Sequence, residues 1–308
     1  MHMRIYCLCL LFLTIASAFV SGQTAEEFHE RGNIKFDHGY LYGAIDDYTK
    51  AIEKDSSYIM AYYNRGFVKS HLGYYEESIE DFTRAIELDP FYVRAYNNRG
   101  AVWTILGEYE SAIEDYSRAI ELHPYNAEAY HNRGRTKKQM DKLDKAVEDF
   151  SKAIENNPEY ARAFNSRGLT RHRQGDIGDA IDDFSKAIEI DSAYAEAFYN
   201  RAMAKTDLGD NQGAVEDFKN VIETGSKLSE SYYKLGNIRF EKGNVQSAID
   251  DYSKAIEHNS DFAEAYYNRG VANFNLGNIE GACSDFREAA DLGFNPAEEF
   301  IKKLCDSQ

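Results

Sequence analysis

The chain has 308 residues, of which 43% are hydrophobic and 14% aromatic. This composition is typical of a folded protein and argues against disorder. The formal net charge of -17 at pH 7 argues against nucleic-acid binding, because affinity for a phosphate backbone comes from clustered lysine and arginine.

The first residues differ in composition from the rest of the chain. One positive charge, at Arg4, precedes an apolar run without charged residues from Ile5 to Phe19. This arrangement predicts a secretory signal peptide over residues 1–22, cleaved after Gly22 or, alternatively, after Ala18. A retained membrane anchor is the other interpretation, although the run is shorter than the roughly 20 residues that a helical span needs. We therefore expect an exported protein of the periplasm, cell envelope or extracellular space.

An Arg-Gly pair recurs along the chain at intervals of 34 residues or a multiple of 34. The pairs are Arg31-Gly32, Arg65-Gly66, Arg99-Gly100, Arg133-Gly134, Arg167-Gly168 and Arg269-Gly270, with Arg201-Ala202 as a near copy. If each glycine is position eight of a repeat, the chain divides into eight units without insertions. These units are 25–58, 59–92, 93–126, 127–160, 161–194, 195–228, 229–262 and 263–296.

Each unit has the pattern of two amphipathic helices. Positions four and twenty-four are aromatic, position twenty is small, and position fifteen is glycine except at Asp141. Helical periodicity puts one apolar side on each helix, and glycine at position fifteen suits a left-handed cap between them. We expect the glycine at position eight to face the small residue at position twenty. One helix pair cannot bury both apolar faces, so neighbouring pairs must stack.

This 34-residue pattern resembles the tetratricopeptide repeat (TPR) family. The resemblance implies an all-α fold, an α-solenoid in which tandem helix hairpins form a right-handed superhelix. Residues 297–308 then form a C-terminal capping helix and tail. The family's leucine at position seven is here mostly arginine, and only Leu235 keeps it.

The arginine at position seven lies on the packed side of the first helix and requires an acidic partner. Position twenty-three is aspartate in all eight units, so we expect Arg99 to pair with Asp115, and the other units to repeat the pair. Basic residues at position eleven are expected to join this network. In the seventh unit, Asp251 has either Arg239 or Arg269 as its candidate partner.

The opposite side of each first helix, which includes positions two, five, six, nine, twelve and thirteen, has no evident packing role. The resemblance implies that this side lines a concave groove that holds peptides. Asparagine recurs there at position six, at Asn64, Asn98, Asn132, Asn200 and Asn268. Side-chain amides offer a donor and an acceptor to the backbone of an extended peptide. The alternative is that asparagine only makes local hydrogen bonds at this position.

Two groups of polar and basic residues share this expected groove. The first occupies positions that resemble the carboxylate clamp of some family members, with two substitutions: His29, Asn33, Asn64, Arg94 and Asn98. The second is a basic group that would select an acidic segment of a partner, or is simply a solvated helix face: Arg135, Lys138, Arg162, His172 and Arg173.

The sequence contains none of the common catalytic, phosphate-binding or metal-binding motifs. We therefore expect no enzymatic activity, no cofactor and no metal. After signal removal, the remaining cysteines are Cys283 and Cys305, which form either one disulfide or two buried thiols. The expected function is a scaffold that binds a peptide or protein segment in its groove. The alternative is a structural component of an envelope assembly that uses convex or terminal surfaces.

Overall fold

The computed structural model describes residues 23–306, so the predicted signal peptide lies outside the described residues. The described part consists of helices joined by short turns. In chain order they are α2 (Ala25–Asp37), α3 (Leu41–Lys54), α4 (Ile59–His71), α5 (Tyr75–Leu88), α6 (Val93–Leu106), α7 (Tyr109–Leu122), α8 (Ala127–Gln139), α9 (Leu143–Asn156), α10 (Ala161–Gln174), α11 (Ile177–Ile190), α12 (Ala195–Asp207), α13 (Asn211–Glu223), α14 (Leu228–Glu241), α15 (Val245–His258), α16 (Ala263–Asn275), α17 (Ile279–Asp291), α18 (Pro296–Phe300) and the π-helical turn η2 (Ile301–Cys305).

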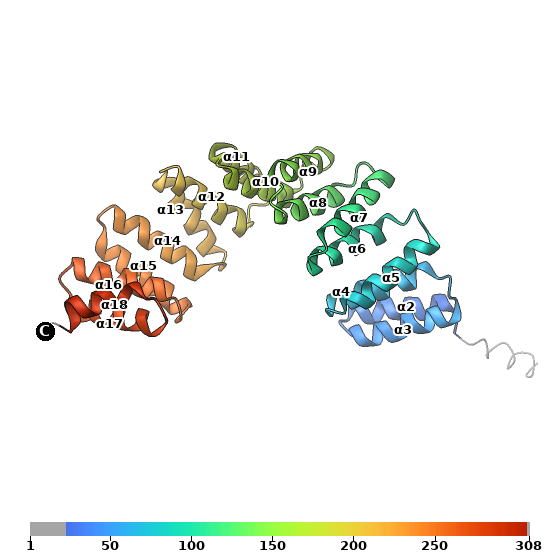
Figure 1. Cartoon of the computed structure of the whole chain (residues 1–308), viewed down its shortest axis with the longest axis horizontal. Helices are drawn as coiled ribbons and strands as arrows, with labels where there is room; N and C mark the ends of the chain where they lie inside the picture. Colours follow the sequence, from blue (N-terminus) through green and yellow to red (C-terminus); the bar gives the residue numbers. More distant parts are fainter. Residues whose placement is uncertain (1–22, 307–308) are drawn as a thin grey trace, which may run out of the picture. The chain divides into compact units, whose positions relative to one another are not determined.

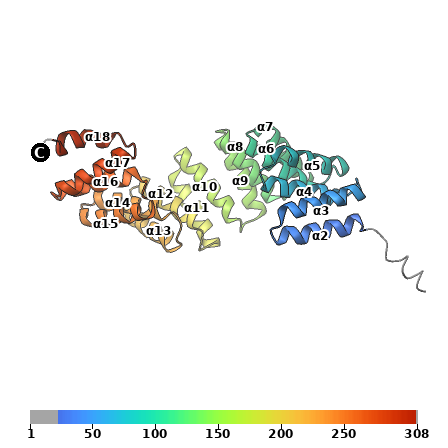
Figure 2. The same ribbon diagram turned by 90° about the horizontal axis from the view of Figure 1, so that it is seen from below.

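The chain forms two compact units, and the boundary between them falls within α9, between Lys145 and Ala146. Within each unit, consecutive helices pair into hairpins and each hairpin packs on the next, as Figures 1 and 2 show. Each expected repeat contains two of these helices. The predicted fold class, an all-α solenoid of tandem hairpins, is confirmed.

A residue in the left-handed backbone conformation follows the first helix of the hairpins, as the glycine at position fifteen predicts. Gly107 has φ 82° and Gly175 has φ 92°, a conformation that glycine adopts without the steric cost of a Cβ atom. Asp141 adopts φ 59° at the same position in the fourth repeat. The turn between the two helices is therefore set by one residue per repeat.

The glycine at position eight lies against the aromatic ring at position twenty-four. In the second repeat Gly66 also makes the expected contact with position twenty, where Ser78 Oγ donates to Gly66 O at 2.8 Å. A Cβ atom on Gly32 would lie 2.6 Å from a ring carbon of Tyr48, and one on Gly168 would lie 2.7 Å from a ring carbon of Phe184. Both rings are fully buried. The flat face of a ring needs the space that a side chain at position eight would fill, so this close approach requires glycine.

The arginine at position seven and the aspartate at position twenty-three form the expected ion pair. Arg99 donates from Nε to Asp115 Oδ2 at 2.8 Å and from Nη2 to Oδ1 at 2.7 Å, a bidentate geometry. The same two-point contact occurs in five further hairpins, in the pairs Arg31–Asp47, Arg65–Asp81, Arg167–Asp183, Arg201–Asp217 and Arg269–Asp285.

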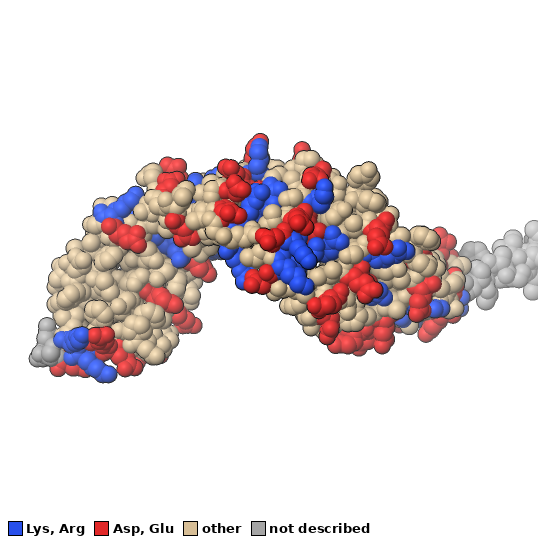
Figure 3. All heavy atoms as spheres, turned by 45° about the horizontal axis from the view of Figure 1, so that its top comes forward, with Lys and Arg blue, Asp and Glu red and all other residues tan. Residues whose placement is uncertain are grey.

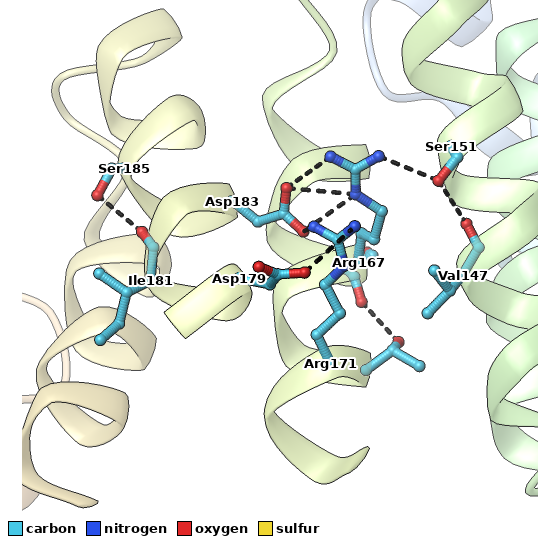
Figure 4. Close-up of polar contacts among 10 residues, drawn as sticks. Val147, Ser151, Arg167, Arg171, Asp179, Ile181, Asp183 and Ser185 are labelled. Atoms are coloured by element: carbon cyan, nitrogen blue, oxygen red, sulfur yellow. Dashed lines mark hydrogen bonds and ion pairs between the residues drawn. The ribbon is translucent and has the colours of Figure 1, made fainter. Parts of the chain in front are cut away.

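The same arginine also connects successive hairpins, which the sequence did not indicate. Arg99 Nη1 donates to Thr83 Oγ1 of the preceding hairpin at 2.9 Å. Figure 4 shows the equivalent contact, in which Arg167 Nη1 donates to Ser151 Oγ at 3.0 Å. The position-seven arginine therefore joins two helices of its own hairpin to the hairpin before it.

Position eleven supplies a second donor to the same carboxylate. Lys69 Nζ lies 2.8 Å from Asp81 Oδ2, and Arg171 Nη1 lies 2.8 Å from Asp183 Oδ2 (Figure 4). In the seventh repeat, Arg239 of the same hairpin pairs with Asp251 at 2.7 Å. This resolves the choice that the sequence left open. We call the repeated Arg–Asp pairs and their position-eleven donors the ion-pair ladder.

The last hairpin is covered by α18 and η2. Phe300 stacks on Phe286 with ring centroids 5.0 Å apart, and a disulfide joins Cys283 of α17 to Cys305 of η2. Of the two alternatives for these cysteines, the structure therefore contains the disulfide. The expected capping helix begins at Pro296 and continues into the π-helical turn, while residues 307–308 lie outside the described residues.

Candidate functional site

The asparagines at position six bind the hairpin before them. Each donates its side-chain Nδ2 to the residue at position five of the preceding repeat. These bonds are Asn64 to His29 Nε2 (2.8 Å), Asn98 to Tyr63 OH (2.8 Å), Asn132 to Asn97 Oδ1 (3.3 Å), Asn200 to Asn165 Oδ1 (2.9 Å) and Asn268 to Tyr233 OH (3.1 Å). The expectation that position five has no packing role is wrong, because Tyr63 is only 4% exposed and Asn97 only 5%.

These contacts change what the asparagines offer to a partner. Asn64 and Asn268 each donate twice from Nδ2, so their amide nitrogens are occupied within the protein. Asn200 is itself buried. The asparagines therefore do not form a uniform ladder of free donors and acceptors, and the position-six pattern arises in part from hairpin stacking.

A group of three hydrogen-bonded residues fixes the amides of Asn33 and Asn64. Tyr48 OH donates to Asn33 Oδ1 at 2.8 Å, and Asn64 Nδ2 donates to the same oxygen at 3.0 Å. Burial raises the pKa of Tyr48 to about 12, so its hydroxyl remains a donor at neutral pH. Among residues 23–306, Asn33 Nδ2 and Asn64 Oδ1 make no hydrogen bond, which leaves one donor and one acceptor available on two neighbouring residues.

Asn33 and Asn64 line a cavity of about 350 Å³, to which α2, α4 and α6 contribute. Two further cavities, of about 190 Å³ and 270 Å³, share lining residues with it and with each other. Phe67 lines all three cavities, so they are neighbours around one side chain. We call the three cavities together the N-terminal groove and define it by Asn33, Phe36, Asn64, Phe67, Arg94 and Asn98.

The second unit contains a cavity built on the same repeat positions. It has a volume of about 270 Å³, and we call it the C-terminal pocket; its lining residues are Asn237, Phe240, Glu241, Tyr252, Asn268 and Val271. Tyr252 OH donates to Asn237 Oδ1 at 2.9 Å, and Asn268 Nδ2 donates to the same oxygen at 3.0 Å. The seventh and eighth repeats therefore reproduce the hydrogen bonds of the first and second.

The residues that resemble a carboxylate clamp are only partly brought together. His29 is 7% exposed and lies behind the groove, where it accepts the bond from Asn64. Desolvation lowers its pKa, so His29 is neutral at pH 7 and supplies no positive charge. Arg94 is exposed and its guanidinium carbon lies 5.0 Å from the centre of the Tyr63 ring. Arg94 is thus the basic residue of the groove.

The second basic group is divided between the two units. Arg135 and Lys138 lie on α8 of the first unit, whereas Arg162 and Arg173 lie on α10 of the second. His172 of α10 lies 2.8 Å from Asp207 through its Nε2 atom. On the face shown in Figure 3, lysine and arginine side chains lie among aspartate and glutamate side chains.

The sequence did not indicate the apolar part of the groove. Phe67 occupies position nine and Phe36 position twelve, and both line the largest of the three cavities. Position nine differs from repeat to repeat, and phenylalanine occurs there only in the second repeat. This deviation from the repeat pattern was the available signal.

None of the helices in residues 23–306 has the length and apolar character of a membrane span. Within the same residues, no group of three or more histidine, cysteine, aspartate or glutamate side chains is arranged to hold a metal ion.

The fold and the groove define a class of protein, the tandem helical-repeat scaffold. Models described as "Tetratricopeptide repeat" match residues 59–92, 93–126, 127–160, 195–224 and 263–292, and one described as "TPR repeat" matches 168–205 and 236–277. The chain belongs to the tetratricopeptide repeat family, whose members bind protein or peptide partners.

Solved structures agree with this assignment. The crystal structure of MamA is 30% identical, with a TM-score of 0.50, and the match covers 54% of this chain and 96% of that one. A tetratricopeptide repeat protein from Parabacteroides merdae is 23% identical, with a TM-score of 0.60 and coverage of 82% and 99%. Pseudomonas aeruginosa pilF is 18% identical, with a TM-score of 0.59 and coverage of 67% and 93%. The last two show the fold alone. A comparison with curated protein sequences finds no match.

Proposed function

We propose that the protein is a non-catalytic scaffold that binds an extended peptide or protein segment in the N-terminal groove. The observation that carries this proposal is that Asn33 Nδ2 and Asn64 Oδ1, which belong to two residues lining one cavity, make no hydrogen bond with the described residues. An extended backbone presents a carbonyl and an N–H at close spacing. The two amides offer the complementary donor and acceptor.

Other residues of the groove would contact the side chains of the bound segment. Phe67 and Phe36 provide apolar contact area, which suits a hydrophobic residue of the segment. Arg94 lies on the same cavity wall, supported by the face of Tyr63. We therefore propose that an acidic side chain or a chain terminus of the segment pairs with Arg94. The second basic group remains a separate prediction for an acidic segment of a partner.

A structural role in an envelope assembly is the second candidate function. It is favoured by large aromatic side chains that are exposed outside the groove: Tyr40 is 69% exposed, Phe91 72% and Tyr125 77%. Exposed aromatic residues of this kind are common in protein interfaces. In that case, substitutions in the groove would leave assembly unchanged.

We also propose that the protein is exported. The charged and apolar pattern of residues 1–22 supports this location, and the Cys283–Cys305 disulfide suits an oxidising compartment. Quantifying free thiols in protein isolated from its native host tests the proposal. Free thiols at Cys283 and Cys305, together with retention of the protein in the cytoplasm, would contradict it.

The peptide-binding proposal is tested by selecting ligands from a library of random linear peptides displayed on phage. The informative variant is Asn33→Asp, which keeps an oxygen to accept from Tyr48 and Asn64 but replaces the free donor with a second acceptor. Asn237→Asp makes the same change in the C-terminal pocket and is the matched control. We expect Asn33→Asp to weaken selected peptides by about tenfold, as loss of a donor to a buried carbonyl does. Equal binding by wild type and both variants would exclude the N-terminal groove and the C-terminal pocket as the peptide-binding site.

A further inference from the structure

In the third repeat, the ion-pair ladder lacks its position-eleven donor. In the first, second, fifth, sixth, seventh and eighth repeats, the position-eleven residue donates to, or pairs with, Oδ2 of the position-twenty-three aspartate. In the third repeat, position eleven is Trp103. Asp115 has Arg99 as its only cationic partner among the described residues. The third repeat therefore has a carboxylate, only 4% exposed, that lacks the position-eleven donor found in these six repeats.

A pocket is present at this position. It has a volume of about 550 Å³ and lies between α6 and α7. Trp103 and Tyr96 contribute aromatic surface to its lining, and Asp115 and Glu114 contribute carboxylates. The pocket belongs to the ladder side of the hairpin, since its lining contains position-four, position-seven and position-eleven residues. The N-terminal groove is lined by other side chains.

The charges of the pocket lining favour a cation. Arg99 is already paired with Asp115 at 2.7 Å, and Arg118 with Glu121 at 3.0 Å. Glu114 has no ion-pair partner among the described residues and lines the same pocket. Desolvation raises the pKa of Asp115, which is the effect expected of a buried carboxylate that lacks a donor.

We propose that this pocket binds a lysine or arginine side chain presented by a partner polypeptide. The incoming cation would take the place that Lys69 fills beside Asp81 in the preceding hairpin. It would donate to Asp115 and Glu114 and lie against the rings of Trp103 and Tyr96, because aromatic faces attract cations. The scaffold then has a recognition site for a basic residue that is separate from the peptide groove.

The chain contains a single tryptophan, so its fluorescence reports directly on this pocket. The probe is a short glycine peptide with one central lysine, titrated into the full mature protein, and the control peptide carries glutamine in place of the lysine. We expect a saturable change in tryptophan emission with the lysine peptide that weakens with added salt. The absence of a saturable change, or the same change with the glutamine peptide, would overturn the proposal.

Two variants locate the binding site. Glu114→Gln keeps the fluorophore and removes the unpaired carboxylate, so affinity should fall about fivefold, the size of one partly exposed ion pair. Glu80→Gln is the matched control, because Glu80 occupies the same position in the preceding hairpin, where Lys69 already completes the ladder. Equal effects of the two variants would contradict the assignment.

Trp103→Lys provides the decisive comparison. This substitution restores the position-eleven cation found in the preceding repeat, so the protein should fold and its melting temperature should rise. Binding of a fluorescein-labelled lysine peptide, measured by anisotropy, should be lost because the site is filled from within. Unchanged binding by the Trp103→Lys variant would show that the peptide binds elsewhere.

Discussion

The side-chain amide of Asn64 donates to Asn33 Oδ1 at 3.0 Å, and both residues line the N-terminal groove. Tyr48 reinforces this bond by donating to the same oxygen. The arrangement requires asparagine at position nine together with tyrosine at position twenty-four, a combination found in the first and seventh repeats. In the third repeat, position nine is Ala101, and the hydroxyl of Tyr116 instead lies 3.3 Å from Thr104 Oγ1.

Replacing Tyr48 with phenylalanine should loosen this arrangement. Asn33 Oδ1 would keep only the bond from Asn64, and the amide of Asn33 could then rotate. We expect Tyr48→Phe to cost about 1 kcal/mol of unfolding free energy and to weaken peptide binding about fivefold. Urea denaturation and peptide titration measure the two effects. Tyr116→Phe is the control, since Tyr116 does not contact Asn33, and its peptide affinity should equal that of wild type.

The ion pair between Arg99 and Asp115 should show strong energetic coupling. Both side chains are largely buried, and removing one partner leaves the other charge without its bidentate contact. A double-mutant cycle with Arg99→Ala and Asp115→Ala should give a coupling energy of at least about 1 kcal/mol. A coupling energy near zero, measured by urea denaturation, would show that the ladder does not stabilise the hairpins.

Protonation of the Asp251 carboxylate should stabilise the folded protein, whereas protonation of the Asp47 carboxylate should destabilise it. Burial raises the pKa of Asp251 to about 6, whereas hydrogen bonding to Arg31 is the main cause that lowers the pKa of Asp47 to about 2. A raised carboxyl pKa means that the native state binds the proton more tightly, so Asp251 favours the folded protein more as pH falls from about 7 to about 4. Asp47 contributes stability above its unfolded value of 3.8 and loses it as pH falls towards about 2.

The variants Asp251→Asn and Asp47→Asn separate these effects. At about pH 8, Asp251→Asn should leave the melting temperature unchanged or raise it, whereas Asp47→Asn should lower it. The difference between wild type and Asp251→Asn should shift in favour of wild type as the pH approaches about 4. A loss of stability on Asp251→Asn at pH 8 as large as that on Asp47→Asn would contradict the assigned pKa directions.

His29 should make the groove sensitive to acid. Burial is the main cause that lowers its pKa below 6.5, while Glu30 and Glu26 act in the opposite direction. Since the unfolded chain binds the proton more readily, stability should decrease as pH falls below 6.5. Protonation also places an N–H opposite Asn64 Nδ2, so peptide affinity should fall with it. His29→Gln should retain its peptide affinity over this range; a parallel loss in both proteins would exclude His29 as the cause.

Periodicity alone was enough to predict the fold, because the same residues recur at the same positions in successive repeats. The Arg99–Asp115 pair could also be predicted, since a buried charge requires a partner and aspartate was invariant at one position. The Gly32–Tyr48 contact was not predicted, because the wheel of one helix does not fix its rotation relative to the next. The packing role of Asn97 and Tyr63 was missed for a related reason: it depends on how neighbouring hairpins stack.

The polar residues Asn33, Asn64, Arg94 and Asn98 were expected in the groove, whereas its apolar part lay beyond the repeat pattern. Phe67 is specific to its repeat, and arginine occurs at position two only at Arg94 and Arg162. The proximity of Phe67 and Arg94 to Asn33 follows from stacking of three successive hairpins. A single sequence distinguishes such residues only by their departure from the repeat. Trp103 also departs from the repeat, because it replaces the basic residue of position eleven. The consequence follows only from the structure, in which the position-eleven donors reach the aspartates.

The most direct test of the account is the side-chain amide spectrum of the ¹⁵N-labelled protein during titration with a peptide selected for binding. We predict that the Asn33 amide resonance, assigned by its absence in Asn33→Asp, shifts and saturates with the peptide because Nδ2 donates to the bound backbone. Saturation of binding with an unchanged Asn33 resonance would contradict the proposed role of the groove.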